Sequence, residues 1–196
     1  MKKIFITGST GFIGKRLTKV INDDIRVLSR KKNLKYETII CNLESDTIPD
    51  NALIGIDTVF HLAGFTHDLS GADKKTNLYN KVNVDATVKL AQLAVKSDVK
   101  NFLFVSSVKA GGKALHGKCS DETDKRIPDG IYGKTKREAE LRLLEIGRNS
   151  KMHVSIVRPA LVYGPNLKGH LKLMLSAIKN SWFPPLPETR NRRSMI

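Results

Sequence analysis

A glycine-rich stretch near the N-terminus constrains the fold more than any other feature of the sequence. Residues 3–7 form a short β-branched and aromatic run typical of a buried strand, and residues 12–21 carry apolar residues at helical spacing. Gly8 and Gly11 lie between these segments, and Gly14 lies near the start of the second. Glycines in such a turn allow a tight bend, close approach of the backbone to a pyrophosphate, and close packing of the helix on the sheet. Any tight strand-to-helix turn can use glycine, but this placement favours a dinucleotide-binding turn.

Strand-like and helical segments alternate along most of the chain. Further strands are expected at 25–29, 38–41, 58–62, 102–106 and 154–157, and helices at 78–96, 132–147 and 167–179. Near-continuous apolar strands alternating with helices predict an α/β fold with a doubly wound parallel sheet of the Rossmann type. We expect a dinucleotide-binding domain over residues 1–160 and the beginning of a substrate-binding lobe over 161–196. Because 193–196 resembles the opening of a strand, we expect that lobe to be truncated.

The charge balance is strongly basic. The 196 residues include 34 Lys and Arg against 19 Asp and Glu, a net charge of +15. Such a charge could serve nucleic acid, an anionic membrane face or phosphorylated small molecules. The lysines are scattered and do not interleave with aromatic residues, so we predict a solvated basic surface and no nucleic-acid partner. A diphosphate ligand would still benefit from the positive field.

Other general features predict a soluble protein of a reducing compartment. Cys41 and Cys119 follow neither a metal-binding nor a disulfide spacing, which predicts a cytoplasmic location. No apolar run is long enough to cross a bilayer, so no membrane insertion is expected. His67, His116, His153 and His170 do not have the spacing of metal ligands, and no metal site is assigned.

The end of the second expected strand carries the selector for the adenosine ribose. An acidic residue there bonds the 2′-hydroxyl, whereas an arginine accommodates a 2′-phosphate. This chain has Arg30, followed by Lys31 and Lys32, and no acid. The pattern also fits a solvated basic turn, but we favour NADP over NAD.

Three polar residues form a candidate catalytic set. Tyr132 and Lys136 stand four apart on an expected helix and so project from one face. A nearby ammonium favours the phenolate, which would lower the pKa of Tyr132 from about 10 toward the working range. Ser106 and Ser107 end the fifth expected strand, where an open α/β sheet binds ligands. A hydroxyl there can hold a substrate oxygen beside the tyrosine, although a serine at a strand end can also be a simple terminator.

Six ordered motifs, spread over essentially the whole chain, resemble the extended short-chain dehydrogenases/reductases, which include UDP-sugar 4-epimerases, dehydratases and 4-keto-reductases. The motifs are the glycine turn 8–14, residues 57–64, Asn83-Val84, Ser106-Ser107, residues 132–136 and Arg158-Pro159. The resemblance implies that Tyr132 is the general acid/base, Lys136 its activator and ribose anchor, and Ser107 the hydroxyl on the sugar C4 oxygen. It also implies cofactor contacts from Gly8, Thr10, Gly11, Phe12, Ile13, Gly14, Arg30, Asn42, Leu43, Leu62, Ala63, Gly64, Tyr132, Lys136 and Pro159.

Some positions depart from the family pattern or carry an alternative interpretation. Asn42 stands where relatives usually have an aspartate beside the adenine, and an amide can still hydrogen-bond there. His61 would pass beneath the cofactor or be a satisfied buried histidine. Asn83 would help shape the nucleotide pocket or be a helix-surface amide.

The subgroup can be narrowed by the same resemblance. Family dehydratases follow the serine with an Asp-Glu pair, whereas this chain has Val108-Lys109-Ala110, which argues against dehydratase chemistry. Residues 158–170 and 191–196 resemble enzymes acting on UDP-N-acetylhexosamines for surface polysaccharide. This implies substrate contacts from Ser107, Asn166 and Arg193, although Arg193 could equally belong to an exposed basic tail.

Together these features predict an NAD(P)-dependent oxidoreductase or epimerase acting at C4 of a UDP-linked (N-acetyl)hexosamine. Exchangeable NADPH at Arg30 favours 4-keto reduction over epimerisation. The alternative is a truncated, non-catalytic nucleotide-binding relative. A homodimer through the helices 78–96 and 132–147 is also expected.

Overall fold

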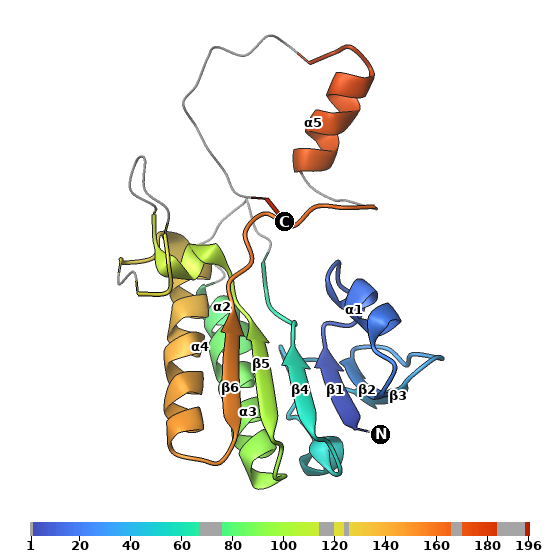
Figure 1. The fold of residues 1–196 in the computed structure, drawn as a ribbon, viewed down its shortest axis with the longest axis vertical. Coiled ribbons are helices and arrows are strands. Elements are labelled where there is room, and N and C mark those ends of the chain that lie inside the picture. The colour runs from blue at the N-terminus through green and yellow to red at the C-terminus, as the bar shows by residue number, and fades with distance from the viewer. Residues whose placement is uncertain (1, 67–75, 114–119, 124–125, 166–169, 184–194) are drawn as a thin grey trace. The chain divides into compact units, whose positions relative to one another are not determined.

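The sheet, within the part of the chain that the structure describes, contains six parallel strands in the order β3-β2-β1-β4-β5-β6. The computed structural model describes residues 2–66, 76–113, 120–123, 126–165, 170–183 and 195–196. The strands are β1 (Lys3–Thr7), β2 (Asp24–Ser29), β3 (Glu37–Ile40), β4 (Thr58–His61), β5 (Asn101–Val105) and β6 (His153–Val157). The arrowheads of β1, β4, β5 and β6 point in the same direction (Figure 1), and β2 and β3 pair parallel to them. The predicted Rossmann-type parallel sheet is confirmed.

Helices and short helical turns connect the strands. They are α1 (Gly14–Val20), α2 (Thr76–Asn80), the π-helical turn η3 (Lys81–Asp85), α3 (Ala86–Lys96), α4 (Gly130–Arg148) and α5 (His170–Lys179), with 3₁₀ turns η1 (Asp50–Leu53) and η4 (Val108–Gly111). The single helix predicted over 78–96 is therefore three consecutive helical segments. Hydrophobic periodicity is nearly the same for an α-helix and for one inserted π turn, so the sequence pattern did not reveal the break.

Both faces of the sheet are covered, as a doubly wound fold requires. One face buries Phe5, Phe102 and Phe104 against Leu90 of α3 and Leu143 of α4. The opposite face is smaller and packs strand residues such as Ile6 and Val27 against Leu17 of α1. Alternate residues of one strand serve the two cores because successive side chains point to opposite faces.

The strand order reverses at β1, which pairs with β2 on one side and β4 on the other. Thr7 and His61 are paired at the carboxyl ends of β1 and β4. In open α/β sheets, ligands bind outside the carboxyl ends of the strands at such a reversal. The topology therefore predicts that a ligand would bind at the loops after β1, β4 and β5.

The chain divides into two compact units, Met1–Arg158 and Pro159–Ile196. The second unit contains α5 and an isolated bridge between Leu161 and Met195, where the sequence led us to expect the opening of a strand. Leu173 and Ile178 of α5 are exposed. The assignment of this unit to a substrate-binding lobe stays a prediction.

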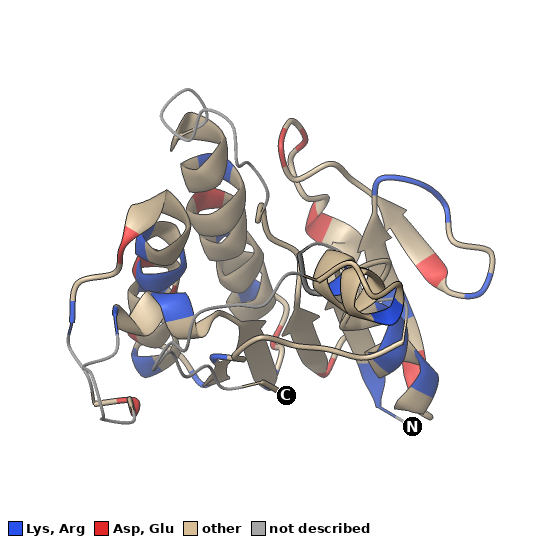
Figure 2. Ribbon diagram, turned by 90° about the horizontal axis from the view of Figure 1, so that it is seen from above, with Lys and Arg blue, Asp and Glu red and all other residues tan. Residues whose placement is uncertain are grey.

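Basic residues are distributed over several elements. Figure 2 shows lysine and arginine on more than one helix and at both ends of the loop that follows β2. Among the residues that the structure describes, no helix combines the length and the apolar character needed to cross a bilayer.

Candidate active site

The turn after β1 is built around two glycines that no other residue could replace without moving the backbone. Gly8 has φ +71°, and a Cβ there would lie 2.7 Å from the backbone nitrogen of Ala63. A Cβ on Gly14 would overlap the carbonyl oxygen of Gly8. The turn is thus pressed against the end of β4, and α1 begins directly on it.

The same turn leaves polar groups free for a ligand. Ile13 precedes α1 without a side-chain cap, and the first turn of the helix has no acidic residue. Ser9 is buried, and its Oγ has no hydrogen-bond partner within the described part of the chain. The Arg16 guanidinium lies 3.8 Å from the centre of the Phe12 ring, which adds positive charge close to the turn. Glycines that admit a close neighbour, uncapped backbone and an unpaired buried hydroxyl together fit a diphosphate.

His61 is held by hydroxyl groups on both ring nitrogens. Its Nδ1 lies 2.6 Å from Oγ1 of Thr7, and its Nε2 lies 2.8 Å from Oγ1 of Thr87. Burial, together with the charge of Lys136, lowers the pKa of His61 to about 3, so the ring is neutral. Thr7 Oγ1 also accepts the backbone N–H of Ala63 at 3.1 Å. His61 is therefore a satisfied structural histidine that fixes the segment after β4.

Two consecutive serines after β5 point in different directions. Ser106 is buried, and its Oγ has no partner among the described residues. Ser107 is partly exposed, precedes η4 and accepts the backbone N–H of Lys109 through its Oγ at 3.3 Å. Its side chain also makes a hydrogen bond with Tyr132 in the first turn of α4. The structure thus brings Ser107, and not Ser106, to the tyrosine.

Tyr132 is protonated at neutral pH. Burial raises the pKa of its phenol above the ordinary value, the hydrogen bond with Ser107 lowers that pKa, and Tyr79 raises it further. The ammonium of Lys109 lies over the Tyr132 ring, 6.0 Å from its centre. A phenol that keeps its proton has the form needed for a general acid.

Lys136 lies one helical turn beyond Tyr132 and is 3% exposed. Its Nζ donates to the carbonyl oxygen of Val105 at 2.9 Å and lies 4.4 Å from the centre of the Phe104 ring. A Cβ on Gly64 would come within 3.2 Å of this Nζ. Burial lowers the pKa of Lys136 to about 8, and the Glu140 carboxylate acts in the opposite direction.

The expectation that Lys136 lowers the pKa of Tyr132 is wrong for this arrangement of side chains. Burial is the largest influence on the Tyr132 pKa and raises it. The Lys136 ammonium is instead directed to the Val105 carbonyl. One helical turn brings the two residues to one face but does not decide which partner the lysine selects.

Asn83, for which the sequence left open a place in the nucleotide pocket or on the helix surface, is buried and holds the backbone of the segment after β4. It lies in η3 and is 1% exposed. Its Oδ1 accepts the Phe65 N–H at 2.7 Å, and its Nδ2 donates to the Phe65 carbonyl at 3.1 Å and to Thr135 Oγ1 at 3.2 Å. Its helical spacing with Ala86 and Leu90 was the available signal, because those apolar residues mark the buried face.

The remaining predicted cofactor residues lie in differing surroundings. Arg30 is exposed and directly follows β2. Asn42 uses its Oδ1 to accept the Glu44 N–H at 3.2 Å, so part of the side chain serves its own loop. Leu43 and Leu62 pack against the larger and the smaller core respectively.

Three predicted residues cannot be placed beside this cluster. Pro159 begins the second unit. Asn166 and Arg193 lie outside the described residues. Their contacts with cofactor or substrate stay predictions.

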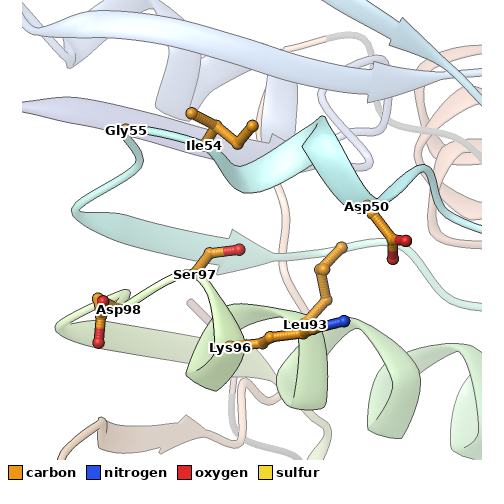
Figure 3. Close-up of a pocket in the computed structure, with 7 residues that line it drawn as sticks. All are labelled: Asp50, Ile54, Gly55, Leu93, Lys96, Ser97 and Asp98. Atoms are coloured by element: carbon orange, nitrogen blue, oxygen red, sulfur yellow. The ribbon is translucent and has the colours of Figure 1, made fainter.

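A hollow of about 320 Å³ lies at the amino ends of the strands, opposite the end that carries the glycine turn and Ser107. It is lined by Asp50, Ile54, Gly55, Leu93, Lys96, Ser97 and Asp98 (Figure 3). These residues precede β4 or end α3, so they lie toward the amino ends of the strands, away from the glycine turn. No group of three or more His, Cys, Asp or Glu side chains in the described segments is arranged to hold a metal.

The described part of the chain is a Rossmann-type α/β domain in which Ser107, Tyr132 and Lys136 lie after β5 and in α4. The sequence matches the NAD dependent epimerase/dehydratase family over residues 4–185, and the chain belongs to this family.

Two curated relatives show what kind of protein the chain resembles. UDP-glucose 4-epimerase from Vibrio cholerae is 32% identical over 209 residues, covering 100% of this chain and 62% of that protein. The N-acetyl-alpha-D-glucosaminyl-diphospho-ditrans,octacis-undecaprenol 4-epimerase from Escherichia coli O157:H7 is 31% identical over 198 residues, covering 98% and 58% respectively. The chain therefore spans about 60% of the length of these relatives.

Solved structures agree in fold. MoeE5 in complex with UDP-glucuronic acid and NAD superposes with a TM-score of 0.80 at 26% identity, covering 89% of this chain and 60% of that chain. UDP-glucose 4-epimerase from Thermotoga maritima with UDP-glucose gives a TM-score of 0.75 at 24% identity, covering 85% and 58%. The latter likeness concerns the fold alone.

Proposed function

We propose that this chain carries the cofactor-binding and catalytic part of an NAD(P)-dependent enzyme acting at C4 of a UDP-linked (N-acetyl)hexosamine. The observation that carries the proposal is the convergence of Ser107 and Tyr132 beside the buried Lys136, at the carboxyl edge of a sheet with a glycine-rich first turn. The two curated relatives are 4-epimerases, one named for UDP-glucose and one for a diphospho-linked N-acetylglucosamine, which supports this substrate class.

The residues would divide the chemistry among them. The nicotinamide cofactor supplies the hydride chemistry when it is bound. Tyr132 exchanges a proton with the sugar C4 oxygen, for which its protonated state suits it. Ser107, already hydrogen-bonded to Tyr132, would hold the same oxygen and orient it. Lys136 supplies positive charge and a ribose anchor beside Gly64.

We favour 4-keto reduction in the synthesis of a surface polysaccharide precursor over epimerisation. A reductase consumes one reduced nicotinamide per sugar, whereas an epimerase regenerates its cofactor and shows no net redox change. The test is a panel of UDP-sugars and UDP-4-keto-sugars, followed for both NADPH oxidation and sugar identity. If the enzyme formed an epimerised sugar without oxidising NADPH, its reaction would be epimerisation and the proposed 4-keto reduction would be wrong. Cofactor binding without turnover of any sugar would favour a non-catalytic nucleotide-binding relative.

We further propose that NADP(H) binds more tightly than NAD(H), because Arg30 at the end of β2 can meet the 2′-phosphate. A hydrogen bond to a charged group contributes about 1.5–3 kcal/mol, roughly ten- to hundredfold in affinity. Calorimetric titration of both cofactors should show this preference in the wild type and its loss in Arg30→Ala. Lys19→Ala, which removes an exposed charge from α1, is the control for a general effect of basicity. Equal affinities in the wild type would contradict the assignment.

A homodimer through α3 and α4 is the proposed assembly. Their outer surfaces form a shallow hollow of about 400 Å³ whose lining includes Val88, Val95 and Ile146. Leu141 and Leu144 of α4 are 48% and 37% exposed. Partly exposed apolar side chains on α3 and exposed ones on α4 are consistent with a surface that pairs with another protein.

A further inference from the structure

We infer that the ion pair between the buried Glu140 and the partly buried Arg158 positions the Ser107, Tyr132 and Lys136 cluster. The inference rests on the proposed function for the roles of those three residues. Its evidence is a set of contacts that joins the segments carrying them.

Glu140 is a carboxylate in the protein interior. It lies one helical turn beyond Lys136 on α4 and is 1% exposed. Arg158 donates its Nε to Oε1 at 2.8 Å and its Nη2 to Oε2 at 2.6 Å, which makes a two-pronged pair. Arg137 approaches Oε2 at 3.5 Å. A buried pair of this kind contributes little net stability compared with apolar side chains, so it points to a role in geometry.

Arg158 connects Glu140 of α4 to two further segments, the end of β6 and η4. It directly follows β6 and is the last residue of the first unit. A Cβ on Gly111 would lie 3.5 Å from its Nη1, so the guanidinium also rests against η4, the turn that follows Ser107. The pair therefore sits where α4, the end of β6 and η4 meet.

The packing of η4 on α4 controls the spacing between Ser107 and Tyr132. A Cβ on Gly133 would lie 2.7 Å from the Lys109 carbonyl oxygen, so the two elements touch backbone to backbone beside the catalytic groups. Ser107 precedes one of these elements and Tyr132 lies in the other. The Glu140–Arg158 pair, about two turns beyond Gly133 on α4, holds the same two elements together and so fixes the relative position of the serine and the tyrosine.

Glu140 also acts on the charge of Lys136. The carboxylate favours the ammonium form and opposes the effect of burial on the Lys136 pKa. Lys136 also acts on His61 of β4, which burial keeps neutral. Arg158 and Arg137 take the oxygens of Glu140, so the carboxylate is itself held in place.

The decisive variant is Glu140→Gln, compared with Glu138→Gln as a matched control. Glu138 pairs with Arg142 at 2.8 Å on the same helix, but that pair is exposed. The primary readout is the pKa of Lys136, followed by NMR of the labelled lysine side chain in the cofactor-free chain. We expect a lower Lys136 pKa and about tenfold weaker NADP(H) binding in Glu140→Gln, and neither change in Glu138→Gln.

Two further variants keep the test decisive if Glu140→Gln folds poorly. Glu140→Gln/Arg158→Met removes both charges of the pair, so that neither partner is left without the other. Arg158→Lys keeps the charge of Arg158 but loses the two-pronged geometry. The Lys136 pKa should therefore stay at its wild-type value, while the cofactor affinity should fall. A folded single or double variant with the wild-type Lys136 pKa and wild-type cofactor affinity would overturn the inference. Because the lysine titration needs neither cofactor nor sugar, failure of wild type to bind NADP(H) would defeat the proposed function alone.

Discussion

Tyr132 and Lys136 lie one helical turn apart, and burial moves their pKa values in opposite directions. Burial disfavours the charged form of each group, which raises the pKa of the phenol and lowers that of the ammonium. Each side chain is therefore closer to its neutral state than it would be in water. Such a pair of shifted groups is typical of a proton-transfer site.

Tyr132→Phe should lower turnover about 10²–10⁴-fold in an active preparation, because it removes only the proton that the tyrosine transfers. Cofactor affinity should change little, since the ring and its packing remain. Steady-state rates with the best sugar of the panel provide the measurement. Tyr163→Phe, at a 54% exposed tyrosine of the second unit, is the control. A Tyr132→Phe enzyme with most of its activity would exclude the proton-transfer role.

Lys136→Met should stabilise the fold at neutral pH while weakening cofactor binding. The folded-state pKa of Lys136 is about 8, below the ordinary 10.5, so the destabilising effect of the buried ammonium is fully present below pH 8. Between about pH 8 and 10.5 the unfolded chain binds more protons, so wild-type stability rises with pH. The advantage of Lys136→Met, of the order of a few kcal/mol, should shrink across this window.

Urea unfolding of both proteins at several pH values measures that difference. Lys134→Met, at an exposed lysine of the same helix, controls for the general loss of a lysine. A gap between wild type and Lys136→Met that stays constant from pH 7 to above 10 would show that burial does not penalise the Lys136 charge.

At the scale of the elements, the turn after β1 and the end of β4 form one unit. Thr7 binds both His61 and the Ala63 N–H through a single hydroxyl, while Gly8 packs on the same segment. Asn83 then holds the next residues through the backbone of Phe65. The loop beside Lys136 is thus fixed from two sides, as a cofactor-binding surface requires.

Gly8→Ala and Gly55→Ala separate backbone strain from steric overlap. Both glycines have φ near +70°, but a Cβ on Gly55 meets nothing within 4 Å. Gly55→Ala should therefore cost only about 1–2 kcal/mol of unfolding free energy. Gly8→Ala adds overpacking against β4, for a total of about 2–5 kcal/mol, and should abolish cofactor binding. Equal losses in the two variants, measured by denaturant unfolding, would refute the close contact at Gly8.

At the scale of the whole molecule, the exposed apolar side chains of α4 belong to the proposed dimer surface. In a two-fold symmetric pair each substitution acts twice, once on each copy. Leu141→Glu should therefore raise the dimer dissociation constant at least about tenfold without affecting the fold. Sedimentation equilibrium measures this effect, with Leu34→Glu, at a 98% exposed residue after β2, as the control. A wild-type chain that stays monomeric at high concentration would exclude this assembly.

The sequence by itself determined the order of the strands and of the main helices. The strand expected at 3–7 has the bounds of β1, and the other five lie within one residue of their predicted positions at either end. The glycine turn, Tyr132 and Lys136 could be selected from local signals: residue type, helical spacing and position after a strand. The same signals did not distinguish Ser106 from Ser107, and only the family resemblance selected Ser107. Helices and strands can be recognised in the sequence because burial of one face gives apolar residues a period of 3.6 in a helix and 2 in a strand.

Only the tertiary structure decided how those residues interact. Glu140 and Arg158 are 18 positions apart, Asn83 and Thr135 are 52 apart, and Thr7 and His61 are 54 apart, yet each pair is within hydrogen-bonding distance. The π turn at η3, the carbonyl that Lys136 selects and the raised pKa of Tyr132 also depend on neighbours from other elements. Local sequence patterns specify which face of an element is buried. They do not specify which side chain meets it there, because that partner is fixed only when the sheet and its covering helices pack together.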